Sequence, residues 1–122
     1  YIDGFVFPIK RAHLAKYKKA AEEVAEIWRD CGALEYNEFI GEDMKLEGVR
    51  PFEDALEMSE DEVVVFGWVV FPSKQVRDTA NEKVSTHSRV LSLIEPLMSS
   101  ENKIFDPGRM CYAGFKPLIK VS

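Results

Sequence analysis

The pattern of hydrophobic and polar positions divides the chain into strand-like and helix-like segments. Residues 1–7 (YIDGFVF) are largely apolar at both odd and even positions, which predicts a strand covered on both faces and ended by Pro8. Residues 12–31 repeat apolar side chains every three or four positions, and Gly32 follows directly. This spacing predicts an amphipathic helix that ends at the glycine.

The middle of the chain predicts two further strands. Residues 33–41 (ALEYNEFIG) form a mixed-face strand, and residues 63–71 (VVVFGWVVF) form a central strand buried on both faces. Between them, residues 42–62 are acidic and interrupted by glycine and proline. Apolar residues separated by even numbers of positions predict a short extra strand in this stretch: Phe52, Leu56 and Met58.

The last third of the chain predicts helices and one strand. Ser73 is the expected cap of a second helix, and a further helical piece covers residues 87–95 and ends at Pro96. Residues 99–108 form a loop that closes on an Asp-Pro-Gly turn, and residues 109–116 form the last strand.

The element order is strand, helix, strand, strand, helix, strand. This order predicts one α+β domain over residues 1–122, with a ferredoxin-like βαββαβ antiparallel sheet and two main helices on one face. Two helices cover only one face of such a sheet, yet the strands 1–7 and 63–71 are apolar on both. A second copy of the chain is the simplest cover for the other face, so we expect a homodimer.

Composition narrows the classes of partner. The 122 residues are 46% hydrophobic, with eight Phe, four Tyr and two Trp, as in a packed globule. No apolar run approaches the roughly 20 residues that span a bilayer, so no membrane association is expected. The net charge of −5 disfavours nucleic acid. A ferredoxin-like sheet can bind RNA, but these strands lack the aromatic and basic residues for it.

The sequence predicts neither a metal site nor a cofactor. Cys31 and Cys111 have neither metal-ligand nor redox-pair spacing. They are expected to be reduced and buried, as in a cytoplasmic protein. The seven glycines do not cluster as in phosphate-binding loops, and no catalytic triad is visible.

Four segments resemble one family: YIDGFVFPI, GALEYNE, VVFGWVVFPSKQVRDTANEKV and FDPGRMCYAGF. They are similar to the YbaA-like family of uncharacterised bacterial proteins, a domain of unknown function, from residue 1 to about residue 118. The resemblance implies a dimeric α+β barrel and carries no established activity. Relatives have Asp-Pro-Arg after the second helix where this chain has residues 86–89 (THSR), so any role of that turn is not carried over.

The strand glycines suggest where a site would lie. If Gly4, Gly67 and Gly114 face the helices, then alternation places one carboxylate among aromatic residues on the opposite, open face. The residues assigned to that face are Asp3, Phe5, Phe66, Trp68, Cys111 and Phe115. Asp3 would be costly to bury there unless paired or protonated, so it is a candidate general acid or base. The structural alternative is that backbone groups or an arginine hold it.

Other polar residues are weaker candidates. Glu38 could share a cavity with Asp3, although an edge strand favours solvent exposure. Arg77 and Asn81 lie one helical turn apart and could hold a carboxylate or phosphate, or simply tie the helix to a strand. Arg109 could pair with Asp3 or Glu38 across the sheet.

Two functions of different kinds therefore remain open. The first is a small-molecule-binding protein or cofactor-independent enzyme, whose apolar cavity holds a small apolar or aromatic ligand. The second is a non-catalytic homodimer whose aromatic sheet face serves only to pair the subunits.

Overall fold

The computed structural model describes residues 1–99 and 103–121, and this part of the chain folds into one sheet with four α-helices. The antiparallel strands are β1 (Ile2–Lys10), β2 (Glu35–Ile40), β3 (Glu62–Val70) and β4 (Cys111–Phe115), in the order β2-β3-β1-β4 across the sheet. The helices are α1 (Leu14–Asp30), α2 (Phe52–Leu56), α3 (Lys74–Ser85) and α4 (Ser88–Met98). Short 3-10 turns precede α1 and β4, at η1 (Arg11–His13) and η2 (Pro107–Arg109).

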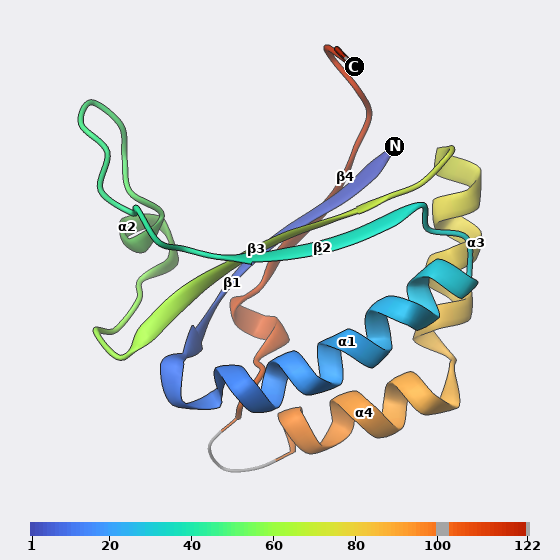
Figure 1. Ribbon diagram of the computed structural model, residues 1–122, viewed down its shortest axis with the longest axis horizontal. Helices are drawn as coiled ribbons and strands as arrows, with labels where there is room; N and C mark the ends of the chain where they lie inside the picture. Colours follow the sequence, from blue (N-terminus) through green and yellow to red (C-terminus); the bar gives the residue numbers. More distant parts are fainter. Residues whose placement is uncertain (100–102, 122) are drawn as a thin grey trace.

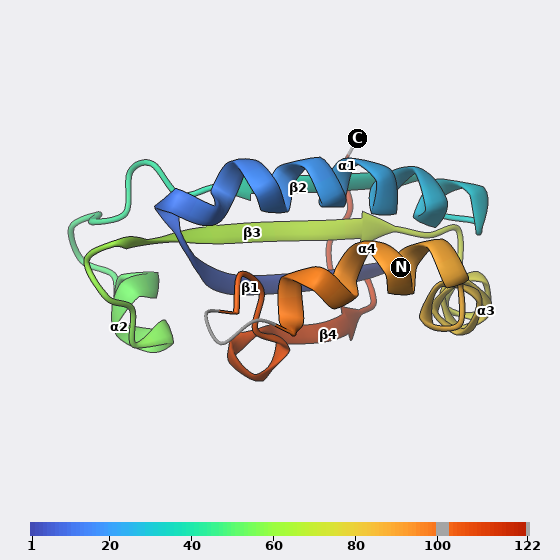
Figure 2. The same ribbon diagram turned by 90° about the horizontal axis from the view of Figure 1, so that it is seen from below.

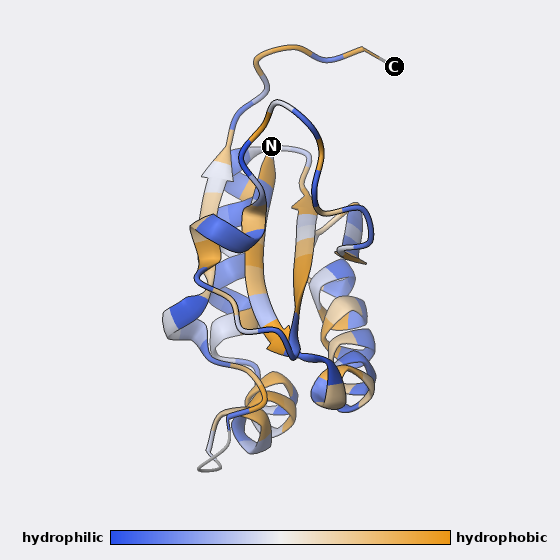
Figure 3. Cartoon of the chain, turned by 90° about the vertical axis from the view of Figure 1, so that its left-hand side faces the viewer, coloured by the Kyte–Doolittle hydropathy of each residue, from blue (hydrophilic) through white to orange (hydrophobic). Residues whose placement is uncertain are grey.

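Three helices cover one face of the sheet (Figure 1). Seen from that side, α1 runs along β2 and β3, α4 lies in front of β1, and α3 stands at one end (Figure 2). We call this covered side the helix face and the opposite side the open face. The strands are mostly hydrophobic, whereas the outer surfaces of the helices are mixed (Figure 3).

The predicted helices form where the apolar spacing placed them. Tyr17 and Val24 on α1 are buried against the sheet. The helix ends at Asp30, and Gly32 follows it with a φ of +125°, which favours glycine. Ser73 caps α3 as expected, because its hydroxyl accepts a hydrogen bond from the Val76 amide at 3.2 Å.

Pro8 does not end the first strand, contrary to the prediction. It lies opposite Val64 within β1, which continues to Lys10. β4 pairs only with residues Ile2 to Val6, so β1 has a free edge beyond that point. A proline that lacks its amide hydrogen is tolerated at such an edge.

The extra strand predicted from Phe52, Leu56 and Met58 is also wrong, since Phe52–Leu56 is the helix α2. Phe52 and Leu56 are four residues apart, which suits one face of a helix as well as one face of a strand. Pro51 directly before the helix and two acidic side chains in its first turn favour the helix.

Two further expectations differ from the structure. Pro96 lies inside α4 rather than ending the helix, and the buried Leu97 fixes the last turn against the core. β3 is central, as expected, but is not fully buried on both faces, because Phe66 on the open face is 42% exposed. The second side of the sheet therefore lacks a complete cover within this chain.

Candidate functional site

Asp3 lies on the helix face, where its side chain is 0% exposed. The Tyr112 hydroxyl donates a hydrogen bond to Asp3 Oδ2 at 2.6 Å, and Arg77 Nε lies 3.4 Å from Oδ1. Arg77 also donates to the Tyr1 hydroxyl at 2.6 Å. We call Asp3, Tyr112, Arg77 and Tyr1 the Asp3 cluster. The carboxylate of Asp3 is therefore paired with an arginine, as expected if the role of Asp3 is structural.

The contacts within this cluster raise the pKa values of Arg77 and Tyr112. The pKa of Arg77 is raised, first by its hydrogen bond to Tyr1 and then by the charge of Asp3. Burial, and next the bond to Asp3, raises the pKa of Tyr112 well above its usual value. Tyr112 therefore remains a hydrogen-bond donor to Asp3 at neutral pH.

The predicted open-face position of Asp3 and Phe5 is wrong, because the strand glycines do not share one face. Phe5 lies opposite Gly67 and both point to the helix face, whereas Gly4 lies opposite Trp68 on the open face. Gly114 is on the helix side, beside Arg77. Because Gly4 lies on the open face and not on the helix face, Asp3 and Phe5 lie on the face opposite to the one predicted.

The other assigned residues do lie on the open face. Phe66, Trp68, Cys111 and Phe115 line one shallow hollow there. The Trp68 ring stacks on Phe39 of the edge strand at 4.9 Å between centroids. Cys111 is exposed rather than buried and Cys31 is half-buried, so the expected burial of both cysteines is wrong for this chain alone.

Glu38 is half-buried on the helix face and is held by two tyrosines. The hydroxyl of Tyr17 donates to Oε1, and that of Tyr36 donates to Oε2 at 2.8 Å. We call these three residues the Glu38 cluster. β2 is an edge strand as expected, but Glu38 points under α1 instead of into solvent.

Burial sets the protonation of the Glu38 cluster. It raises the pKa of Glu38 above the usual value of 4.5, although the two tyrosine hydrogen bonds act in the opposite direction. Burial and the nearby carboxylate also raise the pKa of Tyr17 and Tyr36 well above their usual values. The cluster thus combines a carboxyl group that protonates readily with two firm hydroxyl donors.

An apolar cavity of about 220 Å³ lies between the helices and the sheet. Its lining is aromatic and aliphatic, and comprises Phe5, Tyr17, Ala21, Val24, Trp28, Tyr36, Val69, Val84, Val90, Ile94, Phe105, Met110 and Tyr112. Three of these residues are the tyrosines that hold Glu38 and Asp3. The carboxylates themselves lie behind them and do not line the cavity.

A groove of about 490 Å³ runs along the outside of the same wall, between α1 and β2. It shares Tyr17, Ala21 and Tyr36 with the inner cavity, and Glu38 lines it directly. The Glu38 cluster is therefore the partition between a surface groove and an apolar interior.

The structure separates the remaining candidates. Arg109 is wrong as a partner of Asp3 or Glu38, because it forms a bidentate pair with Glu62 at the opposite end of β3, at 2.5 and 3.1 Å. That pair lowers the pKa of Glu62 to about 2. Asn81 is half-buried one turn beyond Arg77 and is not part of the Asp3 cluster.

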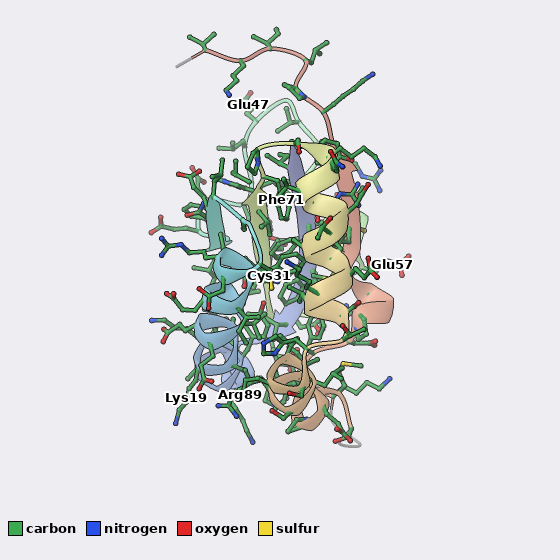
Figure 4. The ribbon with its side chains drawn as sticks, turned by 90° about the vertical axis from the view of Figure 1, so that its right-hand side faces the viewer. Lys19, Cys31, Glu47, Glu57, Phe71 and Arg89 are labelled. Atoms are coloured by element: carbon green, nitrogen blue, oxygen red, sulfur yellow. The ribbon has the colours of Figure 1, made fainter. Side chains whose placement is uncertain are left out.

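The helices also carry contacts outside this site. Arg89 at the start of α4 donates to Glu23 of α1 at 2.6 Å. Figure 4 shows Arg89 at the outer surface of the helices, away from the buried Phe71. Within residues 1–99 and 103–121, no cluster of three His, Cys, Asp or Glu side chains is arranged to hold a metal ion. No helix in this described part is both long enough and apolar enough to cross a membrane.

Sequence reasoning missed the three tyrosines. One signal was available, because Tyr36 and Glu38 are two apart on a strand and must share a face. Tyr17 lies on the apolar stripe of α1 and so faces the sheet. What the sequence lacked was the register that brings this helix turn over Glu38.

Comparison with known proteins places the chain in a family. Residues 1–104 match the family described as "Protein of unknown function (DUF1428)". The chain is 34% identical over 119 residues to "Uncharacterized protein YbaA" of Escherichia coli, a match that covers 98% of this chain and 97% of that protein. The protein of the same name from Shigella flexneri matches to the same extent. The chain therefore belongs to the DUF1428 family of unknown function, in keeping with its resemblance to YbaA-like proteins.

Proposed function

We propose that this protein binds a small, largely apolar molecule in the cavity between helices and sheet, and that Glu38 exchanges protons with it. One observation carries this proposal: three tyrosines line an apolar cavity and each directs its hydroxyl to a buried or half-buried carboxylate. Binding sites for small molecules combine an apolar lining with a few fixed polar groups in this way.

The charges near the cavity favour a neutral ligand. Both carboxylates lie behind its wall, no arginine or lysine is among its lining residues, and Arg77 is already paired with Asp3. An anionic ligand would meet two acidic groups without a free cation to balance it. A neutral aromatic molecule, including one with a hydroxyl group, would meet only ring faces and hydroxyls.

Glu38 is the group best suited to acid–base chemistry. Its raised pKa brings its proton exchange closer to neutral pH, and Tyr17 links it to the cavity by a hydrogen bond. A ligand hydroxyl that takes the place of a tyrosine hydroxyl could pass its proton to this carboxylate. Such a reaction requires no cofactor.

We further propose a ferredoxin-like fold that forms a cytoplasmic homodimer of the dimeric α+β barrel type. The antiparallel order β2-β3-β1-β4 supports the fold, and the aromatic open face supports the pairing. The alternative, a non-catalytic homodimer, rests on that same open face. Because Phe66 and Trp68 lie on the side opposite Asp3 and Glu38, pairing and ligand binding use different faces and do not exclude each other.

A matched pair of probes tests the binding proposal. We suggest 1-naphthol as a neutral aromatic ligand and 1-naphthoate as its anionic counterpart, with quenching of Trp28 as the signal in a Trp68→Phe background. Trp28 lines the cavity and Trp68 lies on the open face. We expect 1-naphthol to bind and 1-naphthoate to bind at least about tenfold more weakly.

A cavity-filling variant locates the bound probe. Ala21→Phe places a ring in the wall that the groove and the cavity share, and should abolish binding of 1-naphthol. Ala15→Phe adds the same ring at an exposed position of α1 and should leave binding unchanged. Equal binding by Ala21→Phe and the parent protein would refute the proposed site.

A further inference from the structure

Residues 116–121 leave the body of the protein after β4 and extend above the open face (Figures 1 and 3). Their apolar side chains are almost fully in solvent, with Leu118 95%, Ile119 82% and Val121 90% exposed. Lys116 and Lys120 give the segment two positive charges. An apolar, basic segment that residues 1–99 and 103–115 leave uncovered is suited to docking elsewhere.

A groove of about 380 Å³ on the open-face side has matching chemistry. Residues 41–51 and α2 form one wall of it, and β2 and β3 form the other. Exposed apolar side chains line it, including Phe39, Leu46, Val49, Phe52 and Phe66.

The rim of this groove is acidic. Glu42 and Asp43 line it together with one basic residue, Arg50, and the same loop carries Glu47 and Lys45, so acidic residues outnumber basic ones by three to two. Figure 4 shows Glu47 on the side of the sheet toward which residues 116–121 extend. The groove is thus apolar inside and negative at its edge, while residues 116–121 are apolar and positive.

We propose that residues 116–121 of one copy dock in the groove of a second copy. This inference rests on the proposed homodimer and adds the contact that would hold it. In one chain, residues 116–121 rise from one end of the sheet and residues 41–51 from the other (Figure 1). A second copy stacked on the open face by a half-turn about the viewing axis of Figure 1 places its own residues 116–121 over the first copy's groove.

The half-turn makes the exchange reciprocal. Each copy gives its apolar segment and receives that of its partner, so the two contacts are equivalent, as twofold symmetry requires. The same stacking covers the exposed Phe66 and Phe115. The lysines of one copy then meet the acidic rim of the other.

Cross-linking tests this contact. In a chain that carries Cys31→Ser and Cys111→Ser, the pair Val49→Cys and Ile119→Cys should form disulfides between chains on mild oxidation. The expected product runs at the mass of a dimer without reductant and at the mass of a monomer with it. A pair built from Lys19→Cys and Ile119→Cys is the control and should not cross-link, because Lys19 lies on the outer surface of α1.

The other outcomes separate this inference from the proposed dimer. A disulfide only within one chain would show that the segment covers its own groove and would overturn the exchange. No cross-link in a protein that light scattering shows to be dimeric would overturn the exchange while the homodimer stands. A monomer at micromolar concentration would overturn both, and binding of 1-naphthol would remain a separate question.

Charge reversal offers a second test that needs no cysteine. Lys116→Glu with Lys120→Glu should raise the dimer dissociation constant at least about tenfold, because the lysines would then face the acidic rim. Adding Glu42→Lys and Glu47→Lys should restore most of the affinity. An unchanged dissociation constant in the first variant, or no restoration in the second, would contradict the docking.

Discussion

Phe5 lies directly opposite Gly67 in the β1–β3 ladder, and its ring fills the space that a β-carbon of residue 67 would occupy. Such a β-carbon would lie 2.6 Å from Phe5 Cε2 and 2.8 Å from the Asn37 carbonyl oxygen. The same ring stacks on Tyr112 at 5.8 Å between centroids and lines the apolar cavity. The missing side chain at position 67 therefore sets the shape of the cavity floor.

The substitution Gly67→Ala should destabilise the protein by about 1–3 kcal/mol, because Phe5 and the β2 backbone must both shift. Gly4→Ala is the control, since its β-carbon meets only the edge of the Phe115 ring, at 3.1 Å, on the open face. Urea unfolding of the two variants measures the difference. Equal losses of stability would mean that Phe5 moves aside freely.

The substitution Asp3→Asn should lower the free energy of unfolding by about 2–4 kcal/mol. It keeps the shape of the side chain but leaves Arg77 without its buried counter-charge. The Tyr112 bond to this position should weaken as well, because it would no longer end on a charged acceptor.

Asp78→Asn provides the matched comparison for that change. Asp78 Oδ1 lies 3.5 Å from the same Arg77 Nε, but its side chain is exposed. We expect a loss below about 1 kcal/mol, as for other surface pairs. Thermal or urea unfolding measures both variants, and similar losses for Asp3 and Asp78 would show that burial does not control this ion pair.

The stability contributed by Glu38 should depend on pH. Since its pKa is raised in the folded state, the folded protein holds the proton more tightly than the unfolded chain. The resulting stabilisation is complete below the unfolded pKa of 4.5 and is lost as the pH rises through the raised value. Glu38→Gln should therefore gain stability relative to the parent protein as the pH rises above 4.5.

Glu35→Gln controls for effects of net charge, because Glu35 is exposed on the same strand. Urea unfolding at several pH values gives the difference between each variant and the parent protein. A difference for Glu38→Gln that stays constant with pH would contradict the burial of this carboxyl group.

The Arg109–Glu62 pair should show the opposite dependence on pH. The pKa of Glu62 is lowered to about 2, so its stabilisation is present above pH 4.5 and is lost as the pH falls toward 2. Arg109→Met should cost about 1 kcal/mol at neutral pH, and this cost should shrink in acid. Lys10→Met, which removes an exposed contact of 4.0 Å to Asp61, should cost less than about 0.5 kcal/mol. Circular dichroism during urea unfolding at each pH would follow both, and an acid-insensitive Arg109→Met difference would contradict the pairing.

The elements of the fold could be predicted because their signals are local. The apolar stripe of the first helix, Gly32 at its end and the Ser73 cap each act within one turn of chain. The failures depended on neighbours that the sequence does not show. Pro8 is tolerated because the pairing of β4 with β1 ends at Val6. The spacing of Phe52 and Leu56 suits a helix and a strand equally, so it did not reveal α2.

The candidate site was less predictable, because faces are set by register between strands. The sequence identified Asp3, Glu38 and Arg77 as candidate residues. It assigned Asp3 to the wrong face of the sheet because the neighbouring Gly4 was assumed to face the helices. The Tyr17 bond to Glu38 joins residues 21 positions apart, and the Tyr112 bond to Asp3 joins residues 109 apart. The spacing of residues within one helix or strand cannot predict contacts between residues so far apart in the sequence.

The alternation of faces along β1 has a consequence for how this protein can change over time. Asp3 and Phe5 point to the helix face, where Phe5 lines the cavity, while Gly4 and Val6 lie on the open face. Under the proposed binding and pairing, mutations at odd positions of β1 would alter which ligand binds, and mutations at even positions would alter the contact with a second copy. The proposed ligand specificity and the proposed pairing thus depend on alternate residues of one short strand. Each property could evolve with little effect on the other.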